Sequence, residues 1–360
     1  MSLFGYASKE YHDERGRDYF FDNAKFILIF LVVLAHATSP LKTVGGTDMK
    51  GIKTIWTIIN TLHMPCLIFI SGYFAKGYIK NGVVKTRRLV TYVVYYLAAQ
   101  LFVSLFEYYV LGYSATMSRS VFAPRSSLWY LMCLIWWFGF LPYIYKLKPS
   151  FIIPASFIVA FLIGYDTKAC DFLSVARMVN HFPFFIIGYY FKKDWLFKFR
   201  KLPIQIAMLA VSFGISVWAY FNIADIPSRI ITSNFNYYEA NLKYLDTEPL
   251  MFLNRLIFYI IAGIFCFTFL LWVPRGKAFF TRFGSRTLQV YILHRFLYLA
   301  ELEYQWYKPF VGTRTGYIEM CLIALALTLI LSLKPFEYPF KWLSKINLKR
   351  FEKSEEEVKV

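Results

Sequence analysis

Two ionisable side chains share one face of the first apolar segment of this sequence. In YFFDNAKFILIFLVVLAHATSPL, residues 19–41, Lys25 stands at the start of the apolar run and His36 lies inside it. Eleven residues make about three turns of an α-helix, so both side chains point the same way, about 16 Å apart along the axis. Asp22 precedes Lys25 by three residues and can form an ion pair with it. Because a neutral imidazole can accept a proton from a hydroxyl group, this stripe has the residue types needed for acid–base chemistry.

The presence of each of these residues can also be explained by a structural role that involves no catalysis. His36 can bond a neighbouring backbone as a packing residue, and Lys25 can be an anchor whose ammonium group reaches the membrane surface. Lipid offers a polar group no partner, however, so such a group usually lines a cavity. Other ionisable or helix-breaking residues recur in apolar segments, namely His63, Pro65, Arg177, His181, Pro183, His294 and Arg295. Four of the five histidines therefore lie in apolar segments, which favours a functional polar interior.

The elements that must position these residues are membrane-spanning helices. Of the 360 residues, 58% are hydrophobic and 21% aromatic, and apolar segments of about 20 residues recur along the whole chain. The pattern predicts an all-α, polytopic membrane protein with about ten transmembrane helices. We place them near residues 21–40, 54–75, 89–112, 127–145, 149–165, 174–191, 203–221, 251–273, 287–303 and 317–333.

Two of these segments contain a proline and could be re-entrant instead. The segment 149–165 is short and holds Pro154, and in the segment 174–191 Pro183 is expected to interrupt the helix.

The distribution of basic residues predicts the orientation. With a cytoplasmic N-terminus, 27 of the 40 Lys and Arg residues fall in cytoplasmic pieces and 12 on the opposite side, while Arg295 lies in a span. This bias places both termini in the cytoplasm. The N-terminal 25 residues are polar and precede the first apolar core, so a cleavable signal peptide is not expected.

Composition argues against two other classes of protein. The net charge of +18 reflects this topology and contact with anionic lipids, because no soluble basic module is present to bind nucleic acid. The cysteines are odd in number and lack metal-binding spacing, so we expect buried free thiols and no metal site. They are Cys66, Cys133, Cys170, Cys266 and Cys321.

Several motifs together resemble one known family. The spacing of Lys25 and His36, with ten residues between them, looks like the Lys/Arg-x10-His signature of the acyltransferase-3 family of integral membrane acyltransferases. Further similarities are HMPCLIFISGYF (63–74), KTRR (85–88), SSLWYL (126–131), FPFFIIGYYF (182–191) and YILH (291–294). The resemblance runs from about Asp18 to Leu333 and is greatest to the fucose 4-O-acetylase-like branch.

The resemblance implies three parts of the chain and a reaction. Residues 1–20 would be a cytoplasmic segment, 21–333 the transmembrane acyltransferase domain, and 334–360 a basic cytoplasmic tail. The reaction would be O-acylation, with acetyl the expected group, of a hydroxyl on a cell-surface glycan or lipid-linked sugar. The donor would be cytoplasmic acetyl-CoA, used as a co-substrate, and no cofactor would be bound permanently. The location would be the cell membrane.

The resemblance also assigns roles to individual residues. His36 would be the general base, and His63, at a similar depth, could orient its ring or serve in packing. Lys25, Lys85, Arg87 and Arg88 would meet the phosphates of the coenzyme, although positive-inside topology is the ordinary explanation of each of them taken separately. The family's basic pair is usually Arg-x-x-Arg, whereas here Lys85 precedes Arg88 and Arg87 is adjacent, which leaves open which cation matters.

The acceptor is expected on the opposite side of the membrane. Candidate acceptor-binding residues are Glu107, Arg177 and His181, and the loop 222–250 has aromatic and acidic residues that suit sugar binding. Each also has an ordinary explanation: Glu107 as a solvated helix end, Arg177 and His181 as a structural pair on one helix face, and the loop aromatics as interfacial residues. His294 and Arg295 are expected nearer the cytoplasm, where they could contact the coenzyme.

A second class of function stays open on sequence alone. A polysaccharide or lipid exporter, or a proton-coupled transporter with His36 as a proton relay, would also have buried ionisable residues and broken helices. The stripe from Lys25 to His36 favours the acyltransferase, because a thioester donor needs it and an exporter does not.

Overall fold

The computed structural model describes residues 11–12, 16–42, 49–80, 83–113, 120–168, 172–240, 242–313 and 315–345. This part of the chain is mostly helical. The longer helices are α1 (Tyr19–Ala37), α2 (Met49–Ala75), α3 (Arg87–Tyr109), α4 (Trp129–Ile144), α5 (Pro149–Leu162), α6 (Val175–Tyr190), α8 (Leu202–Phe221), α10 (Phe252–Trp272), α11 (Thr287–Tyr304) and α12 (Gly316–Leu331). Short elements complete it: helices α7 (Lys193–Phe199), α9 (Ser228–Thr232) and α13 (Tyr338–Ser344), 3₁₀ turns, and the antiparallel pair β1 (Ile79–Lys80) and β2 (Val83–Val84).

Each of the ten predicted segments coincides with one long helix, with ends that differ by a few residues. By length and apolar composition, five helical stretches of the described chain can each cross a membrane, or six if α12 and α13, bent by 63°, count as one span. The five are Tyr19–Ala37, Lys50–Tyr78, Arg87–Tyr109, Leu202–Phe221 and Phe252–Trp272. Helices α4 and α5 are apolar but shorter. The number of about ten crossings and the cytoplasmic termini remain predictions.

The expected interruption at Pro183 is wrong, because α6 continues through this residue. A proline inside a helix removes one backbone hydrogen bond and crowds the preceding turn. Helix α6 tolerates this because its apolar face is buried, with Phe184, Phe185 and Ile186 directly after the proline packed in the core. Pro154 likewise lies inside a continuous α5.

Two glycines allow α2 and α6 to pack backbone against backbone. A Cβ atom on Gly72 would lie 1.9 Å from the carbonyl oxygen of Phe185, and one on Gly188 would lie 2.0 Å from the carbonyl oxygen of Phe69. The contact is thus reciprocal, since each glycine faces the backbone of the other helix. Small residues permit such close approach between membrane helices. The glycines of the SGYF and IGYY sequences therefore have a packing role.

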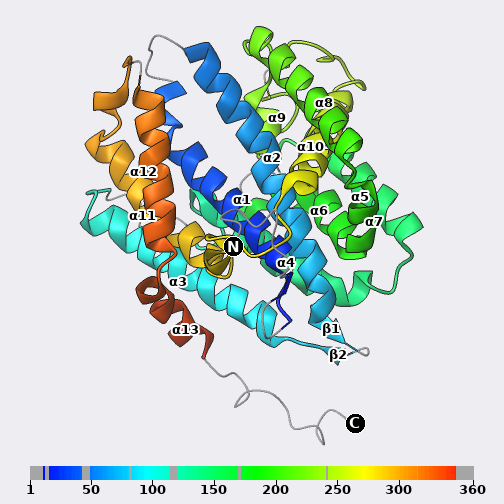
Figure 1. The fold of residues 1–360 in the computed structure, drawn as a ribbon, viewed down its shortest axis with the longest axis horizontal. Helices are drawn as coiled ribbons and strands as arrows, with labels where there is room; N and C mark the ends of the chain where they lie inside the picture. Colours follow the sequence, from blue (N-terminus) through cyan, green and yellow to red (C-terminus); the bar gives the residue numbers. More distant parts are fainter. Residues whose placement is uncertain are drawn as a thin grey trace, which may run out of the picture.

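Helix α1 lies in the middle of the fold and carries the stripe predicted from sequence. It packs against α2, α11 and α12, whereas α8 lies at the periphery (Figure 1). Within the most apolar window of each helix, 72% of the residues are buried for α1 and 11% for α8. The Asp18 side chain caps α1 by accepting from Phe20 N, and Asn23 Nδ2 donates to the carbonyl groups of Pro274 and Gly276. The first bond is local to the start of the helix, whereas the two Asn23 bonds tie α1 to the segment after α10.

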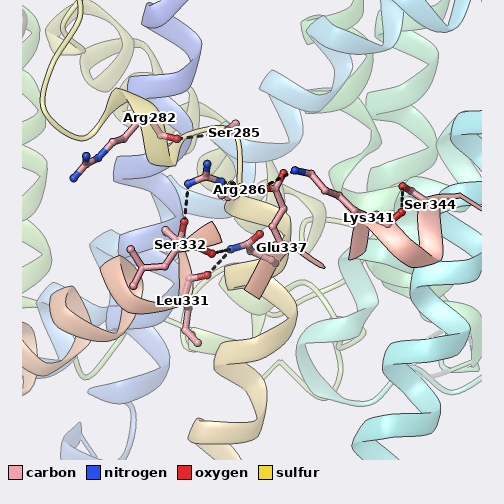
Figure 2. A network of polar contacts seen from close by, with 10 residues as sticks. Arg282, Ser285, Arg286, Leu331, Ser332, Glu337, Lys341 and Ser344 are labelled. Atoms are coloured by element: carbon pink, nitrogen blue, oxygen red, sulfur yellow. Dashed lines mark hydrogen bonds and ion pairs between the residues drawn. The ribbon is translucent and has the colours of Figure 1, made fainter. Parts of the chain in front are cut away.

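A polar network holds the first turn of α11 to the ends of α12 and α13 (Figure 2). Arg286 Nη1 donates to Ser332 O at 3.1 Å, and its Nε lies 3.2 Å from Glu337, which also pairs with Lys341. Gln289 Nε2 donates to Leu331 O at 2.7 Å. The segment 334–344 is therefore bent by 63° from α12 and packs on α3, while the cytoplasmic location of this part of the chain stays a prediction. Residues 346–360 of the predicted tail lie outside the described part, as does most of the predicted segment 1–20.

Candidate active site

Lys25 lies in the second turn of α1 and forms the expected ion pair with Asp22. The distance from Lys25 Nζ to Asp22 Oδ1 is 2.9 Å, and Asp22 also pairs with Arg17. The Lys25 ammonium group lies 5.2 Å from the centre of the Phe74 ring. Because Arg17 already neutralises much of the Asp22 charge, Lys25 retains capacity to bind an anion.

A cavity of about 190 Å³ opens beside Lys25, between α1, α2, α3, α4 and α11. Of the four cations proposed for coenzyme binding, Lys25 and Arg88 line it, whereas Lys85 and Arg87 are exposed and are not among its lining residues. Arg88 Nη1 donates to Phe74 O at 3.1 Å. The remaining lining residues are Ile29, Leu67, Ile70, Ser71, Phe74, Tyr92, Tyr130, Leu134, Phe138, Thr287, Leu288 and Tyr291. We call this space the cation cavity.

Part of the lining of the cation cavity consists of hydroxyl groups and aromatic rings. Ser71 Oγ and Tyr130 Oη lie 2.6 Å apart, and the Tyr130 ring meets the Tyr291 ring edge-on at 5.3 Å. The cavity lining therefore combines cations with hydroxyl groups and aromatic rings.

His36 lies at the wall of a second cavity, also of about 190 Å³, between α1, α11 and α12. The centre of its ring lies 5.2 Å from that of His294 and 4.9 Å from that of Tyr298. The other lining residues are Val33, Ala37, Leu297, Glu301, Trp306, Phe310, Met320, Ile323 and Leu327. We call this space the histidine cavity.

The second histidine of this cavity has a defined tautomer. His294 Nδ1 lies 3.0 Å from Val290 O, which requires the proton on Nδ1. Its Nε2 is buried and has no hydrogen-bond partner among the described residues. His294 therefore presents an acceptor nitrogen in the neighbourhood of the His36 ring.

His63 does not line the cavity that holds His36. It is buried on α2, and its Nδ1 lies 2.6 Å from Ile59 O. A role of His63 in orienting the His36 ring therefore stays a prediction.

The two cavities follow successive turns of the same two helices. On α1, Lys25 and Ile29 line the cation cavity, while Val33 and His36 line the histidine cavity. Helix α11 also lines both cavities, since Tyr291 lines the cation cavity and His294 lines the histidine cavity. The helical rise separates Lys25 from His36 by about 16 Å along the axis.

The proposed acceptor-binding residues lie elsewhere. Glu107 is buried in an ion pair with Arg125. Arg177 and His181 share a face as predicted and both lie against Trp129, the guanidinium at 5.2 Å and the imidazole at 5.1 Å from its ring centre. None of the three lines the histidine cavity.

Sequence reasoning missed the contribution of α11 to the site. It placed His294 toward the coenzyme, whereas the structure packs His294 against His36. His294, Tyr298 and Glu301 follow each other at helical spacing and all line the histidine cavity. The helical spacing of these three residues could have indicated a shared polar face on α11. That this face meets α1 follows from tertiary packing, which the sequence pattern does not show.

The thiols and possible metal ligands add no further site. Of the predicted free cysteines, Cys66, Cys133 and Cys266 are free and buried, Cys321 is free and half-buried, and Cys170 lies outside the described residues. Within the described ranges, no group of three or more His, Cys, Asp or Glu side chains is arranged to hold a metal ion.

The fold and site thus define a helical membrane protein with a histidine pair, His294 buried and His36 half-buried at a cavity wall, and a neighbouring cationic cavity. The family model for the acyltransferase domain of the acyltransferase-3 family matches residues 18–333. The chain belongs to this family of membrane acyltransferases. No curated protein and no solved structure matches the chain.

Proposed function

We propose that this protein is a multi-pass enzyme of the cell membrane that moves an acyl group from cytoplasmic acyl-CoA to a sugar hydroxyl. Acetyl is the expected acyl group, and the acceptor is a cell-surface glycan or a lipid-linked sugar. The observation that carries this proposal is the succession of the cation cavity and the histidine cavity along α1 and α11. One site binds anionic phosphates, and the other holds a base.

The cation cavity suits the coenzyme end of the donor. Lys25 and Arg88 present two cations beside one space, and phosphate groups bind strongly to such pairs. An extended pantetheine arm has a reach comparable to the 16 Å or so between Lys25 and His36. The phosphates can thus stay at the cation cavity while the thioester reaches the imidazole.

His36 supplies the base for the transfer. It removes the proton from the acceptor hydroxyl as the oxygen attacks the thioester carbonyl carbon. The tetrahedral intermediate collapses with cleavage of the carbon–sulfur bond, and the imidazolium returns the proton to the leaving thiolate. The products are an ester and free coenzyme A. His294 and His63 position His36 from α11 and α2 in this scheme.

The two substrates approach from opposite sides of the membrane. With about ten crossings and both termini in the cytoplasm, Lys25 and Arg88 lie at the cytoplasmic end of their helices, and the end of α11 that carries Glu301 lies at the other. Only the acyl group then has to cross, and the acceptor remains outside.

Binding and transfer in proteoliposomes test this function. Purified protein of sorted orientation is given radiolabelled acetyl-CoA on one side and acceptor glycan trapped on the other. Saturable acetyl-CoA binding and labelled acceptor are expected only when the donor is on the cytoplasmic face. An exporter or proton-coupled transporter would bind no acetyl-CoA. If transfer needs both substrates on the cytoplasmic face, the acceptor is a precursor modified before export, and the trans-bilayer arrangement is wrong.

A further inference from the structure

The histidine cavity contains a carboxylate that the acyl-transfer scheme does not use. Glu301 lies two turns after His294 on α11, lines the cavity and is only 8% exposed. Its Oε1 atom is buried and has no hydrogen-bond partner among the described residues. Leaving a buried carboxylate oxygen without a donor is costly, so this atom is suited to a ligand that brings a donor.

The end of α11 places an aromatic ring over the same space. Gln305 adopts the left-handed conformation, with φ of 55°, and the helix ends there. Trp306 N then donates back to Glu301 O at 3.2 Å, so the chain turns and Trp306 joins the cavity lining. The Trp306 side chain is 53% exposed and stacks on Tyr304, with ring centres 5.9 Å apart. Trp306 thus forms part of the cavity rim, with one side of its ring exposed and the other on the cavity.

The size and chemistry of the cavity favour a sugar ring. At about 190 Å³ it is smaller than the roughly 300–1,000 Å³ of pockets for drug-sized ligands, so it suits one ring rather than a chain of rings. A pyranose has hydroxyl groups that donate to a carboxylate and a C–H face that packs on aromatic rings. Tyr298 and Trp306 supply the aromatic surfaces, and Glu301 supplies the acceptor atom.

We propose that the histidine cavity is the acceptor subsite and binds a single pyranose ring, with Glu301 accepting a hydrogen bond from a ring hydroxyl and Trp306 packing on the ring face. This rests on the proposed acyl transfer, since it identifies where its acceptor sits. His36 is then beside a hydroxyl of the bound ring. The rest of the glycan or lipid carrier extends past Trp306 toward the membrane surface.

The test uses octyl β-D-glucopyranoside, below its micellar concentration, with the full chain in lipid nanodiscs. Octan-1-ol is the control ligand, because it has the same alkyl chain and one hydroxyl but no ring. Wild-type protein should bind the glucoside saturably and more tightly than octanol. Glu301→Ala and Trp306→Ala should each weaken glucoside binding and raise its KM roughly ten- to a hundredfold, with little change in kcat.

Two matched variants and a second ligand separate the possible failures. Glu319→Ala and Trp342→Ala change a carboxylate and an exposed tryptophan that do not line the cavity, and should bind the glucoside like wild type. Acetyl-CoA affinity should be retained in the Glu301 and Trp306 variants. Unchanged glucoside binding in those two variants, or equal binding of octanol by wild type, overturns the subsite. Absence of acetyl-CoA binding in wild type overturns the proposed function instead, and the glucoside measurement still decides the subsite.

Discussion

The rings of His36 and His294 lie with their centres 5.2 Å apart, although 258 positions separate them in the chain. His294 holds its proton on Nδ1 through Val290 O, so its Nε2 is available to His36 or to a ligand between them. A pair of this kind can fix the orientation of the base and receive a proton transiently.

His294→Asn should therefore lower kcat. The asparagine amide can still donate to Val290 O but has no atom at the Nε2 position, and loss of acid–base assistance typically costs about 10²–10⁴-fold. His294→Gln, which restores a polar group near that position, should recover part of the rate. Acetyl-CoA affinity, measured by calorimetry, should not change, because His294 does not line the cation cavity. Equal rates for wild type and His294→Asn would leave His294 as a packing residue.

Lys25→Ala should weaken acetyl-CoA binding roughly ten- to a hundredfold, which is the usual value of a hydrogen bond to a charged group. Folding should be little affected, because Asp22 keeps its ion pair with Arg17. Lys25→Arg should retain most of the affinity, since a guanidinium also binds phosphate. An alanine variant with wild-type coenzyme affinity would show that Lys25 is a membrane anchor.

Arg88→Ala should also weaken acetyl-CoA binding, whereas Arg87→Ala should not. The two arginines are adjacent and both exposed, but only Arg88 lines the cation cavity. This makes Arg87 a matched control for the general effect of surface charge. The measurement is the dissociation constant at two salt concentrations, because a nonspecific field is screened by salt. If both variants lose affinity equally, the cation cavity is not a specific phosphate site.

Gly72→Ala should destabilise the protein by about 1–3 kcal/mol or more, because the new methyl group would overlap the carbonyl of Phe185. Gly188→Ala should act in the same way on Phe69. Gly139→Ala is the control, since a Cβ atom there meets nothing within 4 Å. It should be neutral or slightly stabilising in α4. Thermal unfolding in one detergent compares the three variants, and equal melting temperatures would refute the close α2–α6 contact.

The sequence predicted the helices well because their length follows from local composition. Each apolar segment became a helix, and the stripe from Lys25 to His36 follows from the helical period alone. The continuity of α6 through Pro183 was not predictable locally, because burial of the helix outweighs the loss of one hydrogen bond.

Partners between helices could not be predicted from spacing. Three contacts depend on how the helices pack. They are the ion pair of Glu107 with Arg125, the position of Arg88 rather than Arg87 at the cation cavity, and the contact of His294 with His36. Hydropathy determines that a segment is buried but leaves open which helix each face meets. The surroundings of the residues proposed for acceptor binding, Glu107, Arg177 and His181, were therefore the hardest to predict from sequence.

The most direct test of acyl transfer at His36 compares wild type with His36→Ala and His36→Gln in nanodiscs, at equal amounts of folded protein. Transfer of radiolabelled acetyl from acetyl-CoA to octyl β-D-glucopyranoside, or to a purified surface glycan, is measured together with acetyl-CoA affinity. We predict that both variants lose transfer by about 10²–10⁴-fold or more while keeping wild-type affinity for acetyl-CoA. Transfer at the wild-type rate by a folded His36→Ala protein would contradict the assignment of His36 as the base.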